Sequence, residues 1–305
     1  MRVYFCKPQR HHSSVTIYLK NLAASDFFLS LCLPLRVANY GSQSVLMRHV
    51  YCNFGATAFY LNMYASILFM DYIAANRYMK IVRPLETHAL QTVRAARYIS
   101  VATWVFLLAP ASAYLVLSIS SSWGTVPSPG CIGCEMLHSP LTSLLYKVIH
   151  TSSAVVFLFV LISLVLLYRG TARRIQQAQR SSQAKPGCKK LNKSKRNMQV
   201  LVVVFCICFV PYHLVRLPYA FLKPSIHHCT WLQAFYTIKE VTVLLSVLNA
   251  CLDPLIYFIF CKAFRAQLGL QKPDVLSTPR TSVVPELIRR ASRTSATVMR
   301  RESVF

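Results

Sequence analysis

Residues 239–265 read KEVTVLLSVLNACLDPLIYFIFCKAFR, a long apolar run with charged residues at both ends. About 20 consecutive apolar residues are enough for a helix to cross the hydrocarbon layer of a membrane. Five further segments of this length and character occur in the chain. The six predicted membrane helices are residues 15–38, 53–76, 98–119, 146–168, 198–222 and 238–260. The sequence therefore predicts an all-α fold, a membrane helix bundle.

The distribution of positive charge supports a membrane protein. The net charge of +25, from 34 Lys and Arg against 9 Asp and Glu, could by itself suggest a nucleic-acid binder. However, 28 of the 34 cations lie in residues 1–20, 77–97, 169–196 and 262–305, which alternate with sparsely charged connections. Cytosolic loops of membrane proteins carry such an excess. We expect a multi-pass protein of the plasma membrane, surrounded by the lipid bilayer, with no nucleic-acid partner.

The sequence contains no motif typical of an enzyme. A P-loop, a GxSxG nucleophile motif and an HExxH zinc motif are all absent from the 305 residues. The 11 cysteines show no paired zinc spacing, and several lie within apolar runs. We therefore expect no catalytic activity and no organic cofactor.

Asp26 lies in the middle of the first apolar segment. An ionisable side chain at the bilayer centre costs roughly 2.5–3.5 kcal/mol, so it should face the interior of the bundle. There it could meet Ser66, Asn249 and Asp253, and an oxygen-rich group of this kind suits a small hard cation. Asp26 is thus the candidate ligand of a structural Na⁺, in a network that also includes Tyr257 near the end of the last helix.

Several motifs, in their order and spacing, resemble the rhodopsin-like (class A) G-protein-coupled receptors. The matching residues are NLAASD at 21–26, Cys52, Asn76-Arg77-Tyr78, Trp104, CFVP at 208–211 and DPLIY at 253–257. The resemblance implies a seven-helix architecture of which helices 2–7 are present, followed by a short cytoplasmic amphipathic helix near Phe264. We expect this transmembrane domain at residues 1–268 and a disordered Ser/Thr/Arg-rich cytoplasmic tail at 269–305. The first helix is expected to be missing before Met1 through an incomplete gene model, with a fragment or a splice form as the alternatives.

The resemblance also implies a disulfide at the extracellular face. Cys52 opens a helix there, and the following outer loop offers Cys131 and Cys134. Cys134 matches the family position and is the predicted partner, with Cys131 as the alternative. In the resembled subfamily, the cysteine matching Cys229 bonds to an N-terminal cysteine.

The predicted ligand site contains cations on several helices. His213 and Arg216 are three residues apart and share one helical face. Lys239 and Arg36 lie near the outer ends of their segments. Guanidinium and ammonium groups bind phosphate or carboxylate through charge-assisted hydrogen bonds, so we expect a small anionic extracellular ligand. The alternative is that these cations reach the lipid headgroups, or that Glu240 neutralises one of them.

The runs PYHLVRLPY at 211–219 and 239–265 look very like the branch of purinergic receptors for ADP and UDP-sugars, with its orphan relatives. In this branch the positions matching Tyr60, His213, Arg216, Tyr219 and Lys239 contact the base or phosphates of the nucleotide. The resemblance implies a receptor for a nucleotide or nucleotide-sugar that signals through an inhibitory heterotrimeric G protein. The alternatives are a receptor for a lipid or carboxylate anion, and a truncated six-helix fragment that does not signal.

The Asn76-Arg77-Tyr78 motif marks the expected G-protein-coupling end. Most relatives have an acid before the arginine, and its replacement by Asn76 removes an ion pair of the inactive state. We therefore expect raised basal signalling. In the tail, Ser292 and Ser303 follow basic residues as in kinase sites, and the last four residues fit a weak PDZ-ligand pattern, so arrestin and PDZ proteins are further expected partners.

Overall fold

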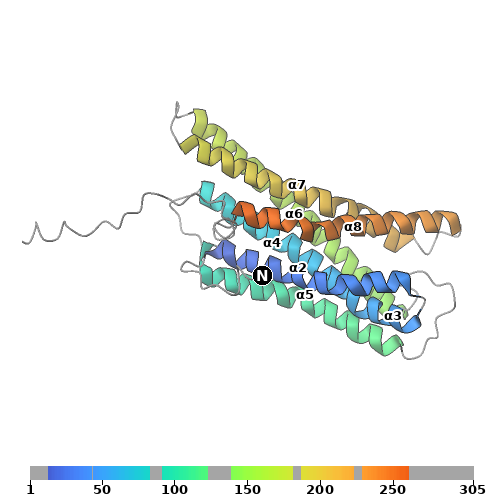
Figure 1. Cartoon of the computed structure of the whole chain (residues 1–305). Coiled ribbons are helices and arrows are strands. Elements are labelled where there is room, and N and C mark those ends of the chain that lie inside the picture. Colours follow the sequence, from blue (N-terminus) through green and yellow to red (C-terminus); the bar gives the residue numbers. More distant parts are fainter. Residues whose placement is uncertain are drawn as a thin grey trace, which may run out of the picture. The chain divides into compact units, whose positions relative to one another are not determined.

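The computed structural model describes residues 13–42, 44–82, 91–122, 139–180, 187–222 and 229–260. These residues form six long helices, one short helix and one π-helical turn, which Figure 1 shows as a bundle. The elements are α2 (Ser14–Gly41), α3 (Val45–Val50), η1 (Tyr51–Gly55), α4 (Ala56–Val82), α5 (Val93–Ser122), α6 (Pro140–Arg180), α7 (Gly187–Leu222) and α8 (Cys229–Phe260). The all-α prediction is confirmed.

Five of the described helices, α2, α5, α6, α7 and α8, are long and apolar enough to cross a membrane. The sixth predicted span lies in α4, which does not reach the same apolarity. The reason is its position, because α4 packs against α2, α5, α6 and α7 and passes through the middle of the bundle. Polar side chains are tolerated there because neighbouring helices, rather than lipid, surround them.

The helices extend beyond the predicted membrane segments, and the longest extensions are those of α6, α7 and α8. Both helices that flank the basic stretch 169–196 run into it, since α6 continues to Arg180 and α7 begins at Gly187. At the start of the second predicted segment the π-helical turn η1 precedes α4. Its last residue is Gly55, where an added Cβ would lie 2.7 Å from Cδ2 of Tyr51. The close approach of this ring explains the glycine.

Side-chain hydrogen bonds join α2 and η1 to α5. Trp104 Nε1 donates to Asn21 Oδ1 at 2.9 Å, and Asn21 Nδ2 donates to Ser100 Oγ at 3.2 Å. Farther along α5, Ser118 Oγ donates to Asn53 Oδ1 at 2.6 Å. Such bonds between helices are the usual polar contacts of a membrane bundle, where lipid offers no partner.

The opposite half of the bundle is held mainly by aromatic and apolar packing. Phe157 of α6 stacks on His213 of α7 with ring centroids 3.7 Å apart, and on Phe205 at 5.8 Å. Ser246 Oγ of α8 donates to the carbonyl of Cys208 at 3.1 Å. Large apolar side chains on the outer faces are exposed, such as Phe159 on α6, as expected of surfaces that contact lipid.

Several predictions lie outside the described residues. The loop cysteines Cys131 and Cys134, the amphipathic helix near Phe264 and the tail with Ser292 and Ser303 all belong to this group. The side chain of Cys229 is likewise not described. These assignments stay predictions.

The contact of Asn21 with Trp104 and Ser100 should be important for stability. We expect Asn21→Ala to lower the free energy of unfolding by about 1–3 kcal/mol, because it leaves the Trp104 N–H without its acceptor in an apolar environment. The measurement is thermal unfolding of the purified protein in detergent. Gln199→Ala, which removes an exposed amide of α7, is the control and should leave the midpoint unchanged. Equal midpoints for the two variants would contradict this role of Asn21.

Candidate ligand-binding and signalling sites

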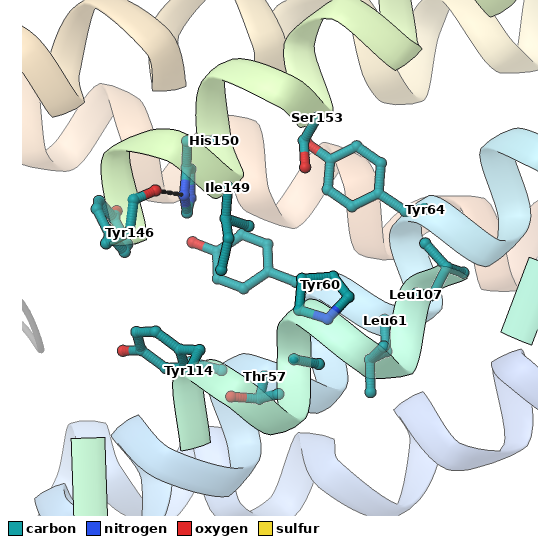
Figure 2. Close-up of a pocket in the computed structure, with 13 residues that line it drawn as sticks. Thr57, Tyr60, Leu61, Tyr64, Leu107, Tyr114, Tyr146, Ile149, His150 and Ser153 are labelled. Carbon is teal, nitrogen blue, oxygen red and sulfur yellow. Dashed lines mark hydrogen bonds between the residues drawn. The ribbon is translucent and has the colours of Figure 1, made fainter. Parts of the chain in front are cut away.

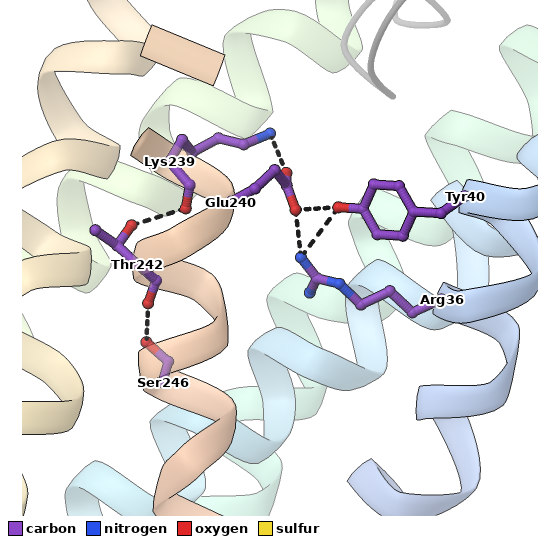
Figure 3. Close-up of polar contacts among 6 residues, drawn as sticks. All are labelled: Arg36, Tyr40, Lys239, Glu240, Thr242 and Ser246. Atoms are coloured by element: carbon purple, nitrogen blue, oxygen red, sulfur yellow. Dashed lines mark hydrogen bonds and ion pairs between the residues drawn. The ribbon is translucent and has the colours of Figure 1, made fainter. Parts of the chain in front are cut away.

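Glu240 lies between two basic residues from different helices, as Figure 3 shows. Its Oε2 atom accepts a hydrogen bond from Arg36 of α2 at 2.5 Å, and its Oε1 atom lies 2.7 Å from Lys239 Nζ. The Tyr40 hydroxyl donates to the same carboxylate. Arg36 and Lys239 are both buried. The single carboxylate of Glu240 offsets only part of their combined positive charge.

One alternative drawn from the sequence was that Glu240 neutralises a single cation. In the structure Glu240 contacts two cations, Arg36 and Lys239, and so offsets part of the charge of each. The geometry also brings Arg36 and Lys239 to one place, as the anionic-site hypothesis requires. No sequence pattern indicated Tyr40, because its hydroxyl reaches Glu240 from a different helix. The cluster carries one more positive than negative charge, so it can attract an anion.

Arg216 lies among three tyrosine rings. Its guanidinium carbon is 5.8 Å from the ring centroid of Tyr60, 5.3 Å from that of Tyr146 and 5.7 Å from that of Tyr219. Cations at such distances are attracted by the negative face of an aromatic ring. The rings therefore help to hold the buried guanidinium in position.

Tyr219 connects these rings to the charged cluster. The Lys239 ammonium lies 5.1 Å from the Tyr219 centroid and 4.2 Å from that of Tyr236. Arg216 and Lys239 thus share one ring, and Lys239 in turn shares Glu240 with Arg36. These contacts link five of the six predicted ligand residues to one another. We call this set the connected surface; it consists of Arg36, Tyr60, Arg216, Tyr219 and Lys239, together with Glu240.

The sixth, His213, takes part in core packing. Its Nδ1 atom bonds to the Phe209 carbonyl at 2.8 Å, and its Nε2 atom lies 3.2 Å from the Tyr64 hydroxyl. A carbonyl can only accept, so Nδ1 is the donor, and in a neutral ring Nε2 accepts from Tyr64. The ring also stacks on Phe157. In this structure His213 positions α7 against α4 and α6.

The network around Asp26 joins α2, α4 and α8. Tyr257 donates to Asp26 Oδ2 at 2.6 Å, and Asn62 Nδ2 lies 3.5 Å from Asp26 Oδ1. Asp253 accepts from Asn249 at 3.1 Å, and its carboxyl group neighbours that of Asp26. Asn62 was not predicted, because an amide in an apolar segment has no distinctive spacing.

Three oxygens in this region fit a small hard cation. Ser66 Oγ, Asn249 Oδ1 and Asp253 Oδ1 are buried and have no hydrogen-bond partner among the described residues. Two neighbouring carboxyl groups repel each other when both are ionised, and a shared proton or a cation relieves the repulsion. The described residues contain no group of three or more His, Cys, Asp and Glu that could hold a metal, so such a site would depend on neutral oxygens as well.

At the opposite end of α4, Asn76 and Arg77 contact different helices. Asn76 Nδ2 donates to Ser14 Oγ at 2.8 Å, whereas Arg77 donates to the Phe260 carbonyl at 3.1 Å. The guanidinium carbon also lies 4.8 Å from the Phe260 ring centroid. The last carbonyls of a helix carry partial negative charge, so the end of α8 is a favourable partner for Arg77.

The structure also shows the contacts of Tyr78, Asp71 and Cys52. Tyr78 packs against α6, where a Cβ added to Gly170 would lie 2.6 Å from Cε2 of its ring. Asp71, for which the sequence suggested no role, accepts a hydrogen bond from Ser163 of α6 at 2.9 Å. Cys52 is disulfide-bonded, and its partner lies outside the described residues.

The pair Arg36–Glu240 should be energetically coupled. A double-mutant cycle with Arg36→Met and Glu240→Gln should give a coupling free energy of about 0.5–3 kcal/mol, because Arg36→Met removes one of the two cations that Glu240 contacts and Glu240→Gln removes the carboxylate that the buried Arg36 contacts. The measurement is thermal unfolding of the four proteins. The control is a second cycle that pairs Lys20→Met with Arg36→Met. Lys20 is 16 positions from Arg36 on the same helix, about 24 Å at 1.5 Å per residue, so the effects of these two substitutions should be additive. Additive effects in the first cycle would contradict the coupling.

Comparison with known proteins agrees with this architecture. The family model of the 7 transmembrane receptor (rhodopsin family) matches residues 3–257. Purinoceptor 14 of Bos taurus is 34% identical over 94% of this chain and 84% of its own length. G-protein coupled receptor 87 of Mus musculus is 30% identical over 85% of this chain and 71% of its own length. Purinoceptor 13 of Rattus norvegicus is 29% identical over 83% of this chain and 74% of its own length.

These relatives confirm the likeness to the purinoceptor branch, and the family consists of receptors and not of enzymes. The match extends over α2 to α8 and includes the residues around Asp26, Arg77 and Lys239. The chain is a multi-pass membrane protein that belongs to the rhodopsin family of seven-transmembrane receptors.

Proposed function

We propose that the chain is a receptor for an extracellular nucleotide or nucleotide-sugar that signals through an inhibitory heterotrimeric G protein. The observation that carries the proposal is the connected surface of Arg36, Lys239, Glu240, Arg216 and Tyr219. It combines buried cations with aromatic rings, which are the two kinds of group that phosphates and bases require. Two of the relatives named above are purinoceptors.

The phosphates would bind Lys239 and Arg216, and the base or sugar would lie against tyrosine rings. Arg216 presents a planar fork of donors that matches two phosphate oxygens, and Tyr60, Tyr146 and Tyr219 already hold it in place. Without a ligand, the carboxylate of Glu240 pairs with Lys239 and Arg36. A ligand phosphate would compete with it for Lys239 and Arg36, so a ligand with several negative charges has the advantage over one with a single carboxylate.

The signal would pass along α7 and α8 to the cytosolic end. Tyr219 and Lys239 place ligand contacts on these two helices, which pack closely against each other. At mid-depth the Asp26 network connects α8 to α2 and α4, and Asp26, Ser66, Asn249 and Asp253 would hold a Na⁺ that supplies positive charge between the two carboxyl groups. We further propose that α4 crosses the membrane with the other five long helices, shielded by them from lipid.

The cations of the connected surface should determine potency. We expect Arg216→Ala and Lys239→Ala each to raise the nucleotide concentration needed for half-maximal inhibition of cAMP formation by roughly 10- to 100-fold, because a lost charge-assisted hydrogen bond costs about 1.5–3 kcal/mol. ADP and UDP-glucose are the probes. Arg48→Ala, which removes a cation on the short helix α3, is the control and should leave potency unchanged.

A nucleotide response that survives both substitutions would reject this binding site. A response to lysophospholipids or fatty acids, with none to nucleotides, would favour the receptor for a lipid or carboxylate anion. Surface expression is measured for each variant, so that loss of protein is distinguished from loss of binding.

Asn76 should raise signalling in the absence of ligand. Its amide bonds to Ser14 while Arg77 bonds to the end of α8, so no carboxylate of the preceding residue restrains the guanidinium. We expect Asn76→Asp to lower basal signalling about fivefold at equal surface expression, since a restored ion pair is worth on the order of 1 kcal/mol. Ser14→Ala, which removes the partner of Asn76 without adding an acid, is the control. Unchanged basal signalling in Asn76→Asp would refute the idea.

A further inference from the structure

The pocket between α4, α5 and α6 belongs to the ligand site already described. Figure 2 shows Tyr60 and Tyr146 among its walls, and the centroids of the same two rings lie 5.8 Å and 5.3 Å from the Arg216 guanidinium carbon. A separate group of cations lies toward the other end of the bundle, on the extensions of α6 and α7. The receptor function proposed above gives these cations no role.

The extensions of α6 and α7 are packed together at the end of the bundle that holds Arg77. A Cβ added to Gly170 of α6 would lie 2.6 Å from the Tyr78 ring, so this part of α6 is at the level of Arg77 and Tyr78. Beside it, the Thr171 hydroxyl donates to the sulfur of Met198 of α7 at 3.3 Å. The two extensions therefore present one joint surface.

The uncharged stretches of both helices end next to this contact. Residues 148–168 of α6 and 197–215 of α7 contain no Asp, Glu, Lys or Arg, and about 20 such residues span the hydrocarbon layer. The next cations are Arg169 and Arg196, each two residues from the contact between Thr171 and Met198. The cations of the two helices thus begin at nearly the same depth, which is that of the lipid head groups.

Five exposed cations lie on these extensions. We call them the basic cluster: Arg169, Arg173, Arg174, Lys193 and Arg196. No Asp or Glu occurs from residue 136 to residue 239, and none of the five forms an ion pair within the described part of the chain. The excess of Lys and Arg in cytosolic segments explains why cations occur here, but it does not require that acids be absent. The cluster is a concentrated positive charge that can attract a polyanion.

One face of α6 is apolar along the membrane and basic beyond it. Ile162, Leu166, Arg169 and Arg173 follow one another at intervals of three or four residues, so they lie along one side of the helix. Ile162 and Leu166 are exposed, whereas Ile175, on the other side of the helix, is buried. Arg169 and Arg173 therefore continue the face of α6 that contacts lipid.

The same pattern occurs on α7. Lys193 and Arg196 are three residues apart, and the exposed side chains of Val203 and Ile207 continue on their side of the helix. Met198, which contacts α6, is buried. A lipid beside either helix would thus place its acyl chains against apolar side chains and its head group against cations.

We propose that the basic cluster binds a polyphosphoinositide, a membrane lipid whose head group carries several phosphates. Four of the five cations are arginines, whose planar fork of donors matches two phosphate oxygens. Clusters of about four to eight Lys and Arg directly cytosolic of a membrane helix are typical of sites for anionic head groups. Several phosphates on one head group can contact cations of both helices, which the single net charge of phosphatidylserine cannot do. This binding does not depend on the ligand of the connected surface.

The test measures lipid binding by native mass spectrometry of the full chain in detergent. Dioctanoyl phosphatidylinositol bisphosphate is the probe, and we expect it to bind at least about tenfold more tightly than dioctanoyl phosphatidylserine. Arg173→Gln/Arg196→Gln should weaken its binding about tenfold, because one cation is lost from each helix. Arg94→Gln/Arg97→Gln is the control. It removes the same charge from exposed positions near the start of α5 and should leave the affinity unchanged.

Four results would overturn the proposal. Equal loss in the two double variants would show a general attraction of anions, and equal affinity for the two lipids would show that several phosphates give no advantage. Unchanged lipid binding in Arg173→Gln/Arg196→Gln would leave these cations to a protein partner. Inositol trisphosphate, which lacks acyl chains, should displace the lipid only at much higher concentration, and displacement at equal concentration would indicate a site for a soluble phosphate. If a variant does not yield monodisperse protein, the comparison of the two lipids and this competition in the unmodified chain decide.

Discussion

Hydrogen bonds from the polar side chains of α4 to three neighbouring helices hold the bundle together. Asn76 bonds to Ser14 of α2, Tyr72 to Thr103 of α5, and Asp71 to Ser163 of α6. Lipid offers no alternative partner, so each bond restricts which face of α4 can meet each neighbour. The central position of α4 follows from this constraint. It also explains how a helix that packs against four others can carry these polar side chains.

The same low-dielectric surroundings shape the outer end of the bundle. Buried cations need compensation, and here it comes from the carboxylate of Glu240 together with the faces of tyrosine rings. The cluster is therefore preorganised before any ligand arrives. Its compensation is incomplete, because one carboxylate serves both Arg36 and Lys239, and the remaining positive charge supports the proposal of an anionic ligand.

Much of the fold could be predicted from the chain alone, since apolar length and the placement of Lys and Arg depend directly on the bilayer. The positions of Asp26, Arg77 and Lys239 were also predictable, because a charge in or near an apolar segment stands out. Tyr40 and Asn62 could not be identified, as tyrosine and asparagine in apolar segments have several ordinary explanations. His213 shares its helical face with Arg216, yet it contacts Phe157 and Tyr64 in the core, which helical spacing alone does not reveal.

The amino-acid sequence by itself determined that the protein is a bundle of membrane helices, which of its ends carry positive charge, and which residues are candidates for binding and signalling. These properties depend on the composition of short segments and on their contact with lipid or water. Only the tertiary structure decided which partner each polar group has, that Glu240 contacts two cations, and that a pocket lies between α4, α5 and α6. These properties depend on how each helix is rotated and which neighbours it meets, and contacts between distant segments determine both.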